Sequence, residues 1–174
     1  MIKYKKSISI LKKNNIYFYR YSIRNNYQEM GLNMVENIKV IKDVLNTILL
    51  ISGRKTTQSH AVYLLGSTLN NLKKQHSFLD NITVKDTTYL EDSEPITIMG
   101  NINELKINKM GPAVKDIITH LNDSLGDEAG HFFLKELSQK LDDESINVLK
   151  EMGVDLELMH LEQQISKMEK DIFK

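Results

Sequence analysis

Residues 35–53, VENIKVIKDVLNTILLISG, contain the clearest evidence for the fold class of this chain. Its apolar residues recur at intervals of three and four positions, which places them on one face of an α-helix. That face consists of Ile38, Ile41, Val44, Leu45, Ile48 and Leu49. Val40 and Ile51 widen it over most of the circumference, as is typical of a helix at the centre of a domain. We therefore expect a central helix that ends at Gly53.

Helical patterns continue on the carboxyl side of this segment. A second helix is predicted to begin at Thr56 or Thr57, because a threonine hydroxyl accepts a hydrogen bond from the first free N–H groups of a helix. Its apolar face is formed by Val62, Leu65, Leu69, Leu72 and Leu79. The neighbours Gly66 and Ser67 are a candidate break that would divide this segment into two helices.

Four more helices are predicted after a hairpin. The third begins at Gly111 and Pro112, because proline at the first helical position removes no helical hydrogen bond. Gly126 and Gly153 mark the ends of the third and fifth helices. The N-caps of the last three helices are predicted to be, in chain order, Asp127, either Asp142 or Asp143, and Asp155.

The hairpin is predicted between the second and third helices. Residues 82–90, ITVKDTTYL, alternate in polarity, EDSEP is typical of a turn, and ITIMG, residues 96–100, is the return strand. A lone hairpin is only marginally stable in water, so we expect it to lie against the helices. The expected fold class is mainly α, or α+β, with about six helices and one two-stranded β-hairpin.

The composition limits the class of protein. A length of 174 residues suggests one domain, and 41% hydrophobic residues suffice for a core. The absence of cysteine excludes disulfides, thiolate metal sites and a cysteine nucleophile. The same absence favours the reducing cytoplasm as the location of the protein. No apolar run approaches the ~20 residues needed to span a bilayer, so we expect no membrane span.

Charge divides the chain into two parts. Residues 1–33 contain seven Lys or Arg and one acid, whereas residues 127–174 contain twelve acids and six lysines. The regular apolar pattern starts only after Met34. We expect a basic, poorly patterned extension over residues 1–33 and a single helical domain over residues 34–174. Three interpretations of the extension stay open: a targeting or membrane-surface segment, a nucleic-acid-binding arm, or a translated leader ahead of a start at Met34.

The most regular pattern lies in the last helix. Apolar residues spaced 4, 3, 4, 3 and 4 apart form a heptad seam: Val154, Leu158, Leu161, Ile165, Met168 and Ile172. The last five are the predicted interaction seam. Glu162 and Glu169 occupy e positions, and Gln164 and Asp171 occupy g positions, so a parallel homodimer gains no opposite-charge pair. We expect the seam to pack inside its own domain, with antiparallel self-pairing and a basic partner as alternatives.

Residues 35–100 also fit a winged-helix DNA-binding module, with a helix, a helix–turn–helix and the hairpin as the wing. Gly66 would lie at the turn. The reading helix would present Asn70, Asn71, Lys73 and Lys74 to base edges and phosphates. Two observations oppose the winged-helix interpretation. The turn is shorter than the usual three or four residues, and residues 34–174 carry more acids than bases, unlike a typical DNA-binding domain.

Two kinds of chemical site can be outlined, and neither is complete. His60, near the start of the second helix, could accept a phosphoryl group, but no acid adjoins it. Two Glu-x-x-His pairs, Glu128 with His131 and Glu157 with His160, match the ligands of carboxylate-bridged di-metal bundles. Such a site also needs one glutamate from each of two other helices, but the first helix offers only Glu36, at its start, and the second offers none. We therefore assign no catalytic, cofactor-binding or metal-ligating residue, and expect no cofactor.

These observations together predict a small, non-catalytic, cytoplasmic regulatory or interaction domain that self-associates through its helix faces. Its partner is expected to be a second copy or another protein. The alternative is a winged-helix DNA-binding regulator whose last helix is a dimerisation element. A phosphotransfer protein that uses His60 is a more distant alternative.

Overall fold

The computed structural model describes residues 37–90, 93–100, 102 and 105–172, apart from the side chains of residues 127–129, 131 and 171. The predicted extension over residues 1–33 and the boundary at Met34 lie outside these residues. In the described part of the chain, no helix is long and apolar enough to cross a membrane.

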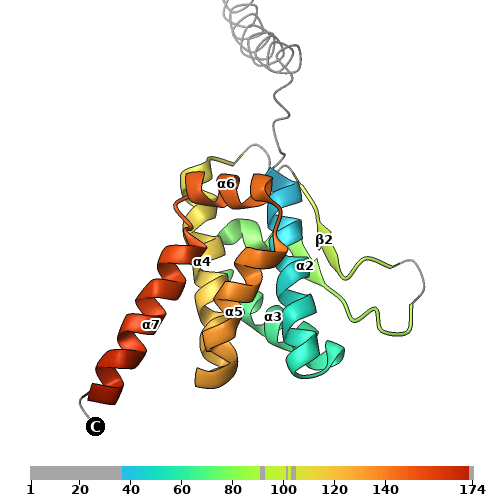
Figure 1. The fold of residues 1–174 in the computed structure, drawn as a ribbon. Coiled ribbons are helices and arrows are strands. Elements are labelled where there is room, and N and C mark those ends of the chain that lie inside the picture. Colours follow the sequence, from blue (N-terminus) through green and yellow to red (C-terminus); the bar gives the residue numbers. More distant parts are fainter. Residues whose placement is uncertain (1–36, 91–92, 101, 103–104, 173–174) are drawn as a thin grey trace, which may run out of the picture. The chain divides into compact units, whose positions relative to one another are not determined.

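Six α-helices and one antiparallel two-stranded hairpin dominate the described part of the chain (Figure 1). In chain order the elements are α2 (Asn37–Lys55), α3 (Gln58–Leu72), the 3-10 helix η1 (Ser77–Asn81), β1 (Ile82–Val84), β2 (Ile96–Ile98), α4 (Ile107–Ser124), α5 (Gly126–Lys140), α6 (Asp143–Glu151) and α7 (Leu156–Ile172). The hairpin follows α3 and precedes α4, which are the second and third of the predicted helices. The predicted fold class is therefore confirmed.

The helix α2 is the central element of the fold. It contacts α3, α5, α6 and the strand β2 (Figure 1). Its apolar side chains are buried around most of the helix, as the sequence pattern predicts. They are Val40, Ile41, Val44, Leu45, Ile48, Leu49 and Ile51. Ion pairs from Lys42 to Glu94, just before β2, and from Arg54 to Glu136 of α5 add surface contacts to the same neighbours.

The hairpin packs on α2 and α3, as expected for strands that are only marginally stable alone. Ile82 of β1 and Ile96 of β2 are buried. The strand β1 is shorter than the predicted run of residues 82–90. The reason is local, because the Asp86 carboxylate accepts a hydrogen bond from the backbone N–H of Thr88 at 3.0 Å and turns the chain out of the ladder.

Three predicted N-caps and two predicted helix ends are confirmed, whereas the predicted N-cap at Asp127 is wrong because α5 already begins at Gly126. Thr57 accepts a hydrogen bond from a backbone N–H of α3 at 3.2 Å. Asp142 accepts one from α6 at 2.7 Å, and Asp155 accepts one from α7 at 3.1 Å. Gly126 and Gly153 follow α4 and α6 with φ angles of 77° and 82°, the left-handed conformation that glycine adopts at a helix end.

Two glycines predicted to interrupt helices lie inside them instead. The helix α2 continues two residues past Gly53, so the predicted end there is wrong. The helix α3 is continuous through Gly66 and Ser67, so the predicted break is also wrong. Leu65 and Leu69 are both buried on one face of α3. Their burial outweighs the roughly 1 kcal/mol that a glycine costs inside a helix.

The start of α4 differs from its prediction for a reason of tertiary packing. The helix begins at Ile107 rather than at Gly111 and Pro112. Met110 is fully buried, and this burial outweighs the hydrogen bond that Pro112 cannot donate inside a helix. Gly111 instead permits a close approach of α4 to the end of α6. A Cβ at this position would lie 1.8 Å from the Met152 carbonyl oxygen.

The N-cap of α6 predicts a pH dependence of stability. The side chain and the backbone N–H of Ser145, together with the Lys39 ammonium 3.5 Å away, hold the pKa of the Asp142 carboxyl below its ordinary value of 3.8. The folded chain therefore binds this proton more weakly than the unfolded chain. Its stabilisation is present above the unfolded pKa and is lost as the pH falls through the folded pKa.

Asp142→Ala is therefore expected to lower the free energy of unfolding by about 1 kcal/mol near neutral pH, and by less at acidic pH. Asp142→Asn is the control, because an amide can still accept the capping hydrogen bond but carries no charge. Urea unfolding of the three proteins at both pH values measures the differences. A loss in Asp142→Ala that does not change with pH would contradict the role given to the carboxylate.

Candidate interaction surface on helix α7

Five large apolar side chains of α7 face solvent. Leu158, Leu161, Ile165, Met168 and Ile172 are each between 45% and 76% exposed. Their heptad spacing places them on one face of the helix. We refer to these five residues as the α7 stripe. The helix packs on its own domain as predicted, but not through these five residues, which the domain leaves exposed.

The helix α7 packs on α5 through its opposite face. Leu156 is 3% exposed, and Met159 packs against the core. The side-chain amide of Gln163 donates a hydrogen bond to Asn122 of α4 at 3.4 Å. With about 3.6 residues per turn, Leu156 and Gln163 lie on the side of the helix opposite Ile165. One face of α7 therefore holds the helix on the domain, and the other face carries the stripe.

The position of α7 in the fold leaves room for a partner. Figure 1 shows α7 at the edge of the bundle, with its last turns projecting away from the other helices. Single apolar residues on a surface are common, whereas a contiguous exposed row is typical of an interaction site. The stripe holds five of the twelve large apolar side chains that are exposed among the described residues.

Charged side chains are distributed unevenly around the stripe. Glu162 and Glu169 lie along one edge of it, and Glu157 lies at the other edge. All three side chains are exposed. Lys167 and Lys170 lie on the far side of the helix, about 120° or more from the centre of the stripe. The edges of the stripe are therefore acidic.

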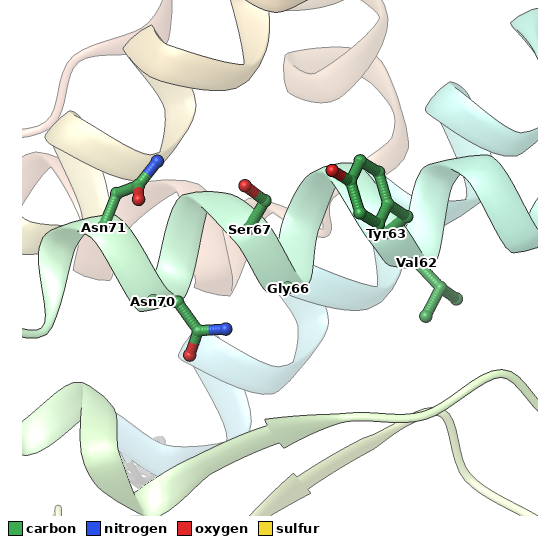
Figure 2. Close-up of a pocket in the computed structure, with 6 residues that line it drawn as sticks. All are labelled: Val62, Tyr63, Gly66, Ser67, Asn70 and Asn71. Atoms are coloured by element: carbon green, nitrogen blue, oxygen red, sulfur yellow. The ribbon is translucent and has the colours of Figure 1, made fainter.

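The residues predicted to read DNA lie on or just after α3, but the predicted turn at Gly66 does not form within this helix. Asn70, Asn71 and Lys74 are exposed, whereas Lys73 is partly buried with its Nζ 3.7 Å from an Asp80 carboxylate oxygen. Figure 2 shows Asn70 and Asn71 pointing to different sides of the helix. Because α3 is uninterrupted, the four predicted residues do not form a separate recognition helix.

A shallow hollow of about 330 Å³ lies on the outer surface of α3 (Figure 2). It is lined by Val62, Tyr63, Gly66, Ser67, Asn70 and Asn71. It forms over Gly66, where an added Cβ would meet no atom within 4 Å. All lining residues belong to one helix, so no second described element supplies polar groups that converge on a ligand.

The predicted phosphotransfer and metal residues are not assembled into a site in the described part of the chain. His60 is exposed in the first turn of α3, and its ring centroid lies 6.4 Å from that of Tyr63. The side chains of Glu128 and His131 lie outside the described residues. Among the described residues, no group of three or more His, Asp or Glu side chains could hold a metal ion.

One polar pair joins residues that no sequence pattern connects. The His76 Nε2 lies 2.7 Å from the Asp116 Oδ2, although the two residues are 40 positions apart. The His76 side chain is only 15% exposed. A His–Asp pair is the orienting half of a hydrolytic triad, but no hydroxyl among the described residues bonds to this ring. The pair therefore joins the segment after α3 to α4 and supplies no nucleophile.

The α7 stripe is thus the candidate functional site, on the basis of its geometry. Comparison of the chain with protein-family models, with curated proteins and with solved structures finds no match.

Proposed function

We propose that this chain is a non-catalytic interaction domain that presents the α7 stripe as a docking surface for the apolar face of another helix. One observation carries the proposal. The helix is anchored through Leu156 and Met159, while a second apolar row on the opposite side stays exposed. An apolar row at heptad spacing matches the way in which two helices pack together.

The regulatory role expected from the sequence belongs to the same proposal, and self-association through the stripe is an outcome that sedimentation tests. A second copy of the chain would offer the same stripe, and either kind of partner would cover it. DNA binding gains no support from the described residues. The predicted turn at Gly66 is part of a continuous helix, and the Lys73 Nζ lies 3.7 Å from an Asp80 carboxylate oxygen.

Binding of synthetic helices tests the docking surface. The assay uses two synthetic helical peptides of three heptads. Both have leucine at the a and d positions, with one tryptophan among these apolar positions. One has lysine and the other glutamate at e and g, so that each repels its own copies. The chain contains no tryptophan, so tryptophan fluorescence reports on the peptide alone. We expect at least one peptide to bind the full chain, and the Ile165→Asp variant to lose that binding because a carboxylate in an apolar interface is left unpaired.

Sedimentation of the full chain over a range of concentrations is the companion measurement, because it detects a second copy on the stripe. Asp123→Ala, an exposed change on α4, is the control and is expected to bind like the unaltered chain. The proposal fails if neither peptide binds and the chain remains monomeric. It also fails if Ile165→Asp leaves the interaction unchanged.

A further inference from the structure

We infer that the helix received by the α7 stripe is basic, with an apolar row flanked by lysine or arginine, and that it comes from another protein rather than from a second copy. The inference rests on the proposed function and concerns the chemistry of the partner. The charged side chains at the two edges of the stripe carry it.

One edge of the stripe has uncompensated negative charge. Glu162 and Glu169 are exposed and occupy successive e positions, where a docked helix would place its own charged side chains. Neither carboxylate has an ion-pair partner among the residues that the structure describes. Two free carboxylates one heptad apart match two cationic side chains at the same spacing.

The other edge repeats this charge in weaker form. Glu157 is a g-position residue whose Oε2 lies 3.6 Å from the Nζ of Lys150 on α6. The side chain of Glu157 is 78% exposed, so solvent screens this pair and a partner can still reach the carboxylate. Gln164, one heptad further along this edge, is uncharged and can pair with either kind of side chain.

A second copy of the chain fits these edges poorly in both orientations. In a parallel pair, the g residue of one helix meets the following e residue of the other, which brings Glu157 against Glu162. In an antiparallel pair each e edge meets the other e edge, which brings Glu162 near Glu169. Lys167 and Lys170 cannot relieve either arrangement, because they lie on the far face of α7. Like charges at such positions oppose pairing, so a basic helix is the matching partner.

The two peptides of the docking assay differ only at the edges and therefore test the inference directly. We expect the lysine peptide to bind the full chain roughly tenfold or more tightly than the glutamate peptide at low salt. The difference should shrink as salt is added, because the pairs are exposed. The double variant with Glu162→Lys and Glu169→Lys should reverse the preference.

Glu151→Lys on α6 is the control for net charge, because it is exposed and lies outside the stripe. It should leave the preference for the lysine peptide in place. Equal binding of both peptides, or tighter binding of the glutamate peptide, would overturn the inference while the docking surface stands. If the unaltered chain sediments as a dimer and the Ile165→Asp variant as a monomer, the stripe binds a second copy. That result would overturn the inference of a basic partner from another protein. Binding of neither peptide by a monomeric chain would remove the docking surface and the inference together.

Discussion

Replacing Gly111 with alanine is expected to lower the free energy of unfolding by roughly 3 kcal/mol. The added Cβ would lie 1.8 Å from the carbonyl oxygen of Met152 and 2.9 Å from its carbonyl carbon. Unbonded carbon atoms are best separated by about 3.5–4 Å. Because both obstructing atoms belong to the backbone, α4 and the end of α6 would have to move apart. That movement would loosen the buried packing of Met110 and Met152.

Gly66→Ala is the matched control, because it makes the same chemical change inside another helix. A Cβ at Gly66 meets no atom within 4 Å, so only the higher helix propensity of alanine remains. This variant is expected to gain about 0.5–1 kcal/mol. Urea unfolding followed by circular dichroism measures both effects. If both alanine variants change the free energy of unfolding in the same direction, the close approach of α4 to α6 does not govern the effect at Gly111.

The second large effect separates the two faces of α7. Leu156→Asp is expected to cost several kcal/mol, a large share of the stability of a domain, because it buries an unpaired carboxylate at a position that is 3% exposed. Leu161→Asp, five residues further along the same helix, lies on the exposed stripe. It should change the free energy of unfolding by about 1 kcal/mol at most.

The same pair of variants behaves in the opposite way in binding. Leu161→Asp should weaken binding of the lysine peptide by roughly a hundredfold, because Leu161 is one of the apolar residues of the docking surface. Leu161→Ala separates lost contact area from added charge and should weaken binding to a smaller extent. If the Leu161→Asp variant is unfolded at every protein concentration, the stripe is part of the core. The assignment of the two faces would then be wrong.

Much of the fold can be predicted from the sequence because the deciding signals are local. The spacing of Val44, Ile48 and Ile51 predicts a buried central helix, whatever packs around it. The capping side chains of Thr57 and Asp142 accept hydrogen bonds from N–H groups only three residues further along the chain. Interactions of such short range form in the same way in many tertiary settings.

The wrong boundaries share a different cause. Gly66 and Pro112 are local signals for a break and a helix start, and in each case burial of nearby side chains outweighs the local preference. Leu69, which follows Gly66, and Met110, which precedes Pro112, are both buried. The energy of that burial depends on helices that are distant in sequence.

The amino-acid pattern alone predicts a mainly helical chain, one hairpin between the helices, and a heptad row on the last helix. Which side of that helix is covered depends on tertiary packing. Both sides offer apolar groups, Leu156 and Met159 on one and Leu161 and Ile165 on the other, so periodicity alone cannot choose between them. The choice depends on how α7 fits α5 and on the hydrogen bond between Gln163 and Asn122. These contacts join residues far apart in the chain, and their energy exists only once the helices have packed.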